Sequence, residues 1–269
     1  MKENNKYRII DMHAHIFPDK IAEKAVASIG RYYHVSMYGP GTVSGLLESG
    51  SKIGVERYVV HSSATTVEQV RPINDYIFQV QSSQPELVGF GTLHPDLEDP
   101  DSEVERILSF GLHGIKLHPE FQGFSIDDET MLPVYKAVEG RLPVLIHMGD
   151  ENKDSSSPVR LAGILEQFPG LVVIAAHFGG YRMWDEASEY LIGKNLYMDT
   201  SSALAFLPAE KAVEMIRRHG ADKMLFGSDY PMWDHADELE RFLRLDLTEE
   251  ERRMILYDNG QRLLDGVCP

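Results

Sequence analysis

The chain has 269 residues, of which 43% are hydrophobic and 25% charged, and its formal net charge is -16 at pH 7. This acidity argues against a nucleic acid partner and against binding to an anionic membrane, because both require a basic surface. The N-terminal MKENNKYRII lacks the apolar core of a signal peptide, and no apolar run approaches the ~18 residues of a membrane span, so we expect a cytoplasmic protein. The single cysteine, Cys268, lies next to the C-terminus, which excludes an internal disulfide and argues against a cysteine nucleophile.

Short apolar, β-branched runs alternate with longer amphipathic stretches along the chain. In chain order, the predicted strands cover 7–12, 57–60, 87–93, 114–117, 143–146, 172–176, 196–199 and 224–226. Predicted helices between them include 67–83, 102–110, 128–139, 158–168, 182–192 and 209–219. A last segment, 248–264, predicts one or two extra helices, and Thr248 with Glu251 matches a capping box.

Eight strands that alternate evenly with helices predict an α/β fold, a single (β/α)8 TIM barrel with C-terminal extra helices. The length agrees with the roughly 250 residues typical of such a barrel. No linker-like tract interrupts the sequence, so we expect residues 1–269 to form one domain. No G-x-G-x-x-G motif follows the first predicted strand, which argues against an open dinucleotide-binding sheet.

Polar residues collect directly after the predicted strands. In chain order they are Asp11, His13 and His15, then His61, His94, Lys116 with His118, His147, His177, and Ser228 with Asp229. Because side chains alternate along a strand, His13 and His15 share a face. The carboxyl ends of parallel barrel strands open on one rim, where catalytic groups collect.

We predict that His13, His15, His147 and Asp229 bind a metal ion. Imidazole nitrogen and carboxylate oxygen suit a divalent ion such as zinc, and we favour one ion over two. A lone H-x-H is a weak signal, and His147 or His177 taken singly is typical of a core histidine. The joint pattern from separate strands carries the prediction. Four further histidines fall in helical or loop segments and are predicted to lie on the surface: His34, His113, His219 and His235.

The order of these residues resembles the amidohydrolase superfamily, in particular its amidohydrolase-related branch of metal-dependent hydrolases and nonoxidative decarboxylases. The matching stretches are GIKLHP at 114–119, AHFGG at 176–180, MDTS at 198–201, LFGSDYP at 225–231 and NGQRLL at 259–264. The resemblance covers essentially the whole chain from 9 to 264. It implies that His13, His15 and His147 are metal ligands and that Asp229 is both ligand and proton acceptor.

The resemblance also implies roles for His177 and Lys116. His177 would contact the substrate or the attacking water, or would bind a second ion. Lys116 lies near the position of the lysine that is carboxylated and bridges two ions in binuclear members. An unmodified Lys116 could pair with a substrate carboxylate, or it could be an ordinary charge paired with Asp150 or Glu120.

The expected function is that of a metal-dependent hydrolase, in which metal-activated water attacks an amide, lactone or ester carbonyl of a small molecule. Asp229 would accept the proton and His177 would stabilise the oxyanion. The alternative is a metal-dependent nonoxidative decarboxylase of a small aromatic or unsaturated carboxylic acid, with Asp229 or His177 handling a proton at carbon. The decarboxylases of this branch tend to be longer, which favours hydrolysis. A noncatalytic binding barrel would be expected to lack at least one metal-ligand position, and none is missing here. A homodimer is compatible with the resemblance.

The loop predicted after the first strand, 16–41, is rich in aromatic residues around one arginine: Phe17, Arg31, Tyr32, Tyr33 and Tyr38. Loops on this rim set specificity, and such a cluster would suit a small cyclic or aromatic acid. The same tyrosines are equally compatible with packing of the loop onto the barrel. Trp184 and Trp233 follow later strands and are predicted to wall the pocket.

Overall fold

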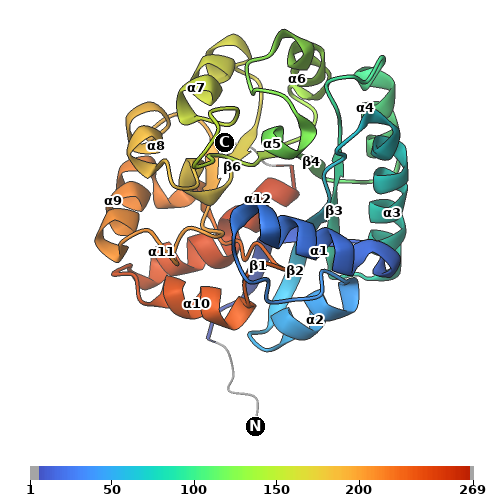
Figure 1. Cartoon of the computed structure of the whole chain (residues 1–269). Coiled ribbons are helices and arrows are strands. Elements are labelled where there is room, and N and C mark those ends of the chain that lie inside the picture. The colour runs from blue at the N-terminus through green and yellow to red at the C-terminus, as the bar shows by residue number, and fades with distance from the viewer. Residues whose placement is uncertain (1–5, 267–269) are drawn as a thin grey trace. The chain divides into compact units, whose positions relative to one another are not determined.

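The computed structural model describes residues 6–266, so Cys268 lies outside the described residues. This part of the chain contains the strands β1 (Ile9–His15), β2 (Val55–His61), β3 (Leu87–Thr92), β4 (Gly114–Leu117), β5 (Val144–Ile146), β6 (Val173–Ala175), β7 (Tyr197–Asp199) and β8 (Met224–Leu225). Its α-helices are α1 (Asp19–Tyr33), α2 (Val43–Ser51), α3 (Val70–Ser83), α4 (Pro100–Ser109), α5 (Pro119–Gln122), α6 (Leu132–Val138), α7 (Pro158–Gln167), α8 (Trp184–Tyr190), α9 (Ala209–His219), α10 (His235–Leu243), α11 (Glu249–Arg253) and α12 (Asn259–Leu264). Figure 1 shows them coloured in chain order.

The strands follow one another in one sheet in chain order, from β1 to β8. Each strand is followed by at least one helix, which confirms the predicted (β/α)8 barrel class. The chain divides into two units, one formed by Met1–Val60 with Thr200–Pro269 and the other by His61–Asp199. None of the helices within residues 6–266 is long and apolar enough to cross a membrane.

In the first unit, the segment from β8 onwards runs beside β1. The backbone N–H of Met12 donates to the carbonyl of Phe226 at 2.9 Å, and Ala14 forms a parallel bridge with Tyr230. On the helix side of β1, a Cβ added at Gly260 of α12 would meet the side chain of Met12 at 3.0 Å. The even-numbered residues of β1 therefore face the covering helices, and its odd-numbered residues face the other way.

In the second unit, β3 to β7 are parallel, and the register of β3 with β4 pairs Thr92 with Lys116. A Cβ at Gly91 would meet Ile107 of α4 and Asn74 of α3, so the odd-numbered residues of β3 face these helices. Figure 1 shows α3 and α4 beside β3. Since the pleat alternates, Thr92 and its register partner Lys116 lie on the opposite, fully buried face of the sheet.

Two local expectations differ in outcome. The C-terminal helices are confirmed, including a capping box in which Thr248 and Glu251 bond reciprocally; a π-helical turn at Met254–Asp258 joins α11 to α12. The segment 16–41, predicted as a loop, is wrong for most of its length because it contains α1. Its aliphatic residues Ala22 and Val26 recur at helical spacing and are buried, as on the inner face of an amphipathic helix.

Candidate metal centre

Three predicted ligands of the first unit lie at one point. The Nε2 atoms of His13 and His15 are 3.3 Å apart, and Oδ1 of Asp229 lies 3.4 Å from the first and 3.2 Å from the second. Donors held ~2.0–2.2 Å from one ion, at the angles of tetrahedral or octahedral coordination, are themselves separated by roughly 3.0–3.5 Å. The nearly equilateral triangle therefore has the dimensions of one face of a metal coordination shell.

Two serines orient this triangle. Ser201 Oγ lies 3.0 Å from Nδ1 of His13, which leaves Nε2 directed at the other donors. Ser202 Oγ donates to Oδ2 of Asp229, and Trp233 Nε1 in turn donates to Ser202 Oγ at 2.9 Å. Such partners set ring orientation and ligand basicity in metal sites. Ser201 belongs to the MDTS stretch of the resemblance, whereas no pattern in the sequence marked Ser202 as a contact of a ligand.

The backbone at Asp229 is bent to bring its carboxylate to the histidines. Its φ of 57° lies in the left-handed region, which is uncommon for a residue with a side chain. Its N–H donates to the carbonyl of His13 at 2.8 Å, which attaches this turn to β1. A Cβ at Gly227 would lie 2.8 Å from Cβ of His13, so only glycine allows the two segments to approach this closely.

In the second unit, buried histidines follow neighbouring strands. The β4–β5 register places His118 beside His147, and their rings stack with centroids 4.0 Å apart and an interplanar angle of 6°. Nε2 of His177, which follows β6, lies 3.0 Å from Nδ1 of His147. The structure thus brings together the predicted ligand His147 and the predicted substrate contact His177.

The protonation state of His147 follows from its contacts. Its Nε2 lies 2.9 Å from the carbonyl oxygen of Gly149, and a carbonyl can only accept, so the ring proton sits on Nε2. Burial, followed by the neighbouring His118, His177 and Lys116, holds the pKa of His147 well below its usual value. The ring is therefore neutral, with its lone pair on Nδ1, the atom that faces His177.

The backbone of His177 is held by two further groups. Its N–H donates to Oδ1 of Asp199 at 3.0 Å, and its carbonyl accepts from Nε1 of Trp184 at 3.0 Å. His177 itself has a φ of 61°, a conformation that needs such support. Trp184 and Trp233, predicted as pocket walls, thus each donate a hydrogen bond that supports a candidate site residue.

Glu120 is a buried carboxyl group that the sequence suggested only as a partner for Lys116. Its Oε1 accepts from Ser156 Oγ, and its Oε2 lies 3.5 Å from Nδ1 of His118 and 4.0 Å from Nε2 of His147. Burial raises the pKa of Glu120 to about 7, although the Ser156 hydrogen bond acts in the opposite direction.

His118, Glu120 and His147 together resemble a set of metal ligands, because their donor atoms lie within 4.8 Å of one another. An ion lies in the plane of each imidazole that binds it. Two nearly parallel rings stacked face to face cannot both meet that requirement for one ion. In this arrangement the three residues form a packed, buried cluster at the end of β4 and β5.

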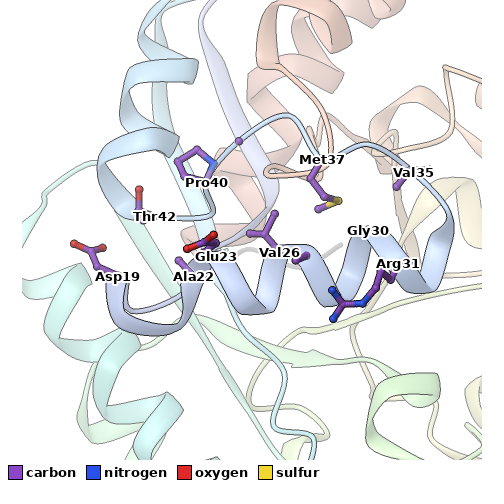
Figure 2. Close-up of a pocket in the computed structure, with 12 residues that line it drawn as sticks. Asp19, Ala22, Glu23, Val26, Gly30, Arg31, Val35, Met37, Pro40 and Thr42 are labelled. Carbon is purple, nitrogen blue, oxygen red and sulfur yellow. The ribbon is translucent and has the colours of Figure 1, made fainter.

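A pocket of about 770 Å³ lies between α1 and the segment that follows it, and Figure 2 shows its lining residues. Val26 and Met37 are among its apolar lining residues, while Asp19, Glu23 and Arg31 supply its charges. Two carboxylates against one guanidinium are unfavourable for an acidic ligand. Of the residues predicted to form an aromatic cluster, only Arg31 lines this pocket.

Two predicted surface histidines are buried instead. His235 is 0% exposed and His219 is 6% exposed, so the prediction is wrong for both. His235 begins α10 on the same face as the buried Glu238, Leu239 and Phe242, and this i, i+3, i+4, i+7 spacing marks the inner face of the helix. His34 is exposed, as predicted, and His113 is half-buried.

A comparison with family models finds a match to the amidohydrolase model over residues 10–266. The chain belongs to the amidohydrolase family. A gamma-resorcylate decarboxylase from Polaromonas sp. is 22% identical over 264 residues, which cover 76% of this chain and 78% of the relative.

Solved structures share the fold of this amidohydrolase. An uncharacterized TIM-barrel protein from Bordetella bronchiseptica matches with a TM-score of 0.75 and 20% identity over 97% of this chain and 99% of its own. A dihydroxybenzoic acid decarboxylase from Polaromonas sp., solved with bound manganese and an inhibitor, matches with a TM-score of 0.73 and 17% identity over 96% of this chain and 97% of its own.

These comparisons correct the main functional expectation. The relatives with an assigned activity named above are decarboxylases, which matches the alternative and not the hydrolase. The chain spans 78% of the resorcylate decarboxylase and 97% of the dihydroxybenzoic acid decarboxylase structure. Hydrolases and decarboxylases of this family can use the same donor types, so the ligand pattern could not separate them.

Proposed function

We propose that this amidohydrolase is a metal-dependent nonoxidative decarboxylase of a small aromatic or unsaturated carboxylic acid. The observation that carries the proposal is the triangle formed by His13 Nε2, His15 Nε2 and Asp229 Oδ1, with edges of 3.2–3.4 Å. It has the dimensions of a coordination face, and the named relatives remove carboxyl groups from hydroxylated benzoic acids.

The metal ligands would be His13, His15, His147 and Asp229, and one divalent ion is proposed. His147 is suited to this role because it is neutral and its proton sits on Nε2, which leaves a lone pair on Nδ1. Three imidazole nitrogens and a carboxylate suit zinc, whereas the dihydroxybenzoic acid decarboxylase binds manganese. Elemental analysis of the purified protein distinguishes the two metals and counts the ions.

Decarboxylation breaks the bond between the carboxyl carbon and the adjacent carbon, and the electron pair remains on that adjacent carbon until it takes up a proton. When bound, a divalent ion would supply positive charge for the substrate carboxylate and a neighbouring oxygen. Asp229 or His177 would deliver the proton to carbon. Ser202 and Asp199 restrict the movement of these two residues through the hydrogen bonds described above.

The burial and charge of Lys116 support the proposal that the substrate is an acid. Its side chain is fully buried on the face of the sheet opposite α3 and α4, and its positive charge is one of the causes that lower the pKa of His147. A cation at this depth favours a ligand that carries negative charge. We propose that Lys116 is unmodified and pairs with a substrate carboxylate.

The test is carbon dioxide release by the metal-loaded protein from a panel of hydroxybenzoates and unsaturated carboxylic acids. We expect release from at least one acid and no cleavage of matched esters, lactones and amides. Cleavage of those neutral compounds without carbon dioxide release from any acid would overturn the proposal. Analytical metal content accompanies each assay, so that an unloaded preparation is recognised.

Two variants separate ligand from proton donor. Asp229→Asn should lose bound metal and lower turnover by orders of magnitude while the fold is retained. His177→Asn should keep a single bound ion and lose turnover. Full activity in either variant would remove that residue from the mechanism, and loss of metal in His177→Asn would favour two ions.

A further inference from the structure

Asp11, on β1, has a buried carboxylate that accepts hydrogen bonds from four donor groups. Its Oδ1 accepts from the backbone N–H of His13 at 3.1 Å and of Ser228 at 2.9 Å. Its Oδ2 accepts from Ser228 Oγ at 2.6 Å and from Nε2 of His235 at 3.0 Å. Asp11, Ser228 and His235 are each 0% exposed.

These bonds occur where the regular pairing between β1 and the segment after β8 is interrupted. Met12 N–H donates to the Phe226 carbonyl, and the next backbone bond to β1 comes from Asp229 N–H to the His13 carbonyl. The N–H of Ser228, which lies between them, goes to the Asp11 carboxylate instead of a backbone carbonyl. The pairing irregularity turns Asp229 toward the histidines and leaves the Ser228 N–H without a backbone acceptor on β1. The Asp11 carboxylate supplies that acceptor.

His235 completes the arrangement from α10. A carboxylate only accepts, so Nε2 of His235 carries the proton that bonds to Asp11. Nδ1 of the same ring lies 2.8 Å from Ser49 Oγ. The chain of contacts joins α2, α10 and β1 behind the metal-ligand triangle, and none of its members belongs to that triangle.

We propose that Asp11, held by His235, is a positioning residue of the metal centre. One carboxylate links the backbone of His13 on β1 to that of Ser228, the residue before Asp229, and thereby sets the separation of His13 from Asp229 in the segment after β8. The proposal rests on the proposed metal site. It assigns a role to a histidine that sequence reasoning had placed on the surface.

The test compares metal affinity with stability in Asp11→Asn and His235→Ala. In Asp11→Asn, the amide oxygen can still accept from the two N–H groups, but its NH₂ faces two groups that donate in the wild type. We expect about 10- to 100-fold weaker binding of Co²⁺ and Mn²⁺, the range seen when an outer-shell partner of a metal ligand is removed. We also expect a changed Co²⁺ visible absorption spectrum, which reports ligand geometry directly.

The matched control is Asn259→Ala, at the opposite end of β8. Asn259 is fully buried and donates to the carbonyls of Met224 and Ala221, each at 2.8 Å. This variant should unfold at a lower temperature without its metal and yet keep the wild-type cobalt spectrum and affinity. His235→Gln, which retains an N–H donor, should recover part of the affinity lost in His235→Ala.

The outcomes separate the two proposals. A wild-type protein that binds no divalent ion overturns the proposed function, and the positioning role with it. Wild-type binding together with unchanged affinity and spectrum in folded His235→Ala and Asp11→Asn overturns the positioning role alone. Should Asp11→Asn fail to fold, the comparison of His235→Ala with His235→Gln decides the question in the same way.

Discussion

Replacing Glu120 by glutamine should stabilise the metal-free protein above neutral pH and have little effect near pH 4.5. The carboxyl group is buried, its Oε1 accepts from Ser156, and its Oε2 has no hydrogen-bond partner among the described residues. Burial therefore disfavours the carboxylate and raises the pKa of Glu120 to about 7. Glutamine has the same shape, and its carbonyl oxygen can still accept from Ser156.

The direction and the size of this change in stability follow from the pKa values of Glu120 in the unfolded and in the folded protein. Between the ordinary value of 4.5 and about 7, the folded protein keeps a proton that the unfolded chain has lost. The stabilising effect of that proton is complete below about pH 4.5 and is lost as the pH rises through about 7. A difference of about 2.5 units (7 minus 4.5) corresponds to roughly 3 kcal/mol at ~1.36 kcal/mol per unit.

The assay is urea unfolding of wild type and Glu120→Gln, in the presence of a chelator, at pH 5 and pH 8. The free energy of unfolding of the variant should exceed that of wild type by about 2–3 kcal/mol at pH 8, and the gap should shrink toward pH 5. Glu129→Gln, at an exposed position in the same unit, is the control. A gap of the same size at both pH values would refute the reasoning, because a packing effect does not titrate.

Two further substitutions test the supports of the site. Ser202→Ala removes the hydroxyl that donates to Asp229, so metal affinity should fall about ten-fold or more in a chelator competition assay; lower stability at unchanged affinity would contradict this. Gln122→Leu removes a buried amide that accepts from His118 N–H and donates to the carbonyls of Ala64 and Leu93, at 2.7–2.9 Å. The free energy of unfolding should fall by about 3 kcal/mol, since buried backbone groups lose their partners; a loss below about 1 kcal/mol in urea unfolding would show that water replaces the amide.

Local periodicity was sufficient to place the secondary structure. Alternation of apolar runs and amphipathic stretches depends on neighbours within a few residues, and it located all eight strands. It also placed His13 and His15 on one face of β1, because the pleat has a period of two. The predicted strand boundaries also placed polar side chains directly after the strands, where the structure finds His147 and His177 in contact.

Function was less accessible to the sequence. The ligand types that suggest a metal-dependent hydrolase are equally those of a decarboxylase, since both chemistries need a divalent ion beside a proton-transferring carboxylate. The choice between them depends on the shape and charge of the surrounding pocket. The comparisons with known decarboxylases corrected the expectation.

The sequence by itself determined which residues carry donors and which strands deliver them. The tertiary structure decided how far apart the donors lie, through an irregular step in strand pairing and the left-handed turn at Asp229. It also decided that His235, 224 positions from Asp11, is a buried partner and not a surface residue. Periodicity is a property of neighbouring residues, whereas these contacts depend on the backbone path of segments that meet only in the folded chain.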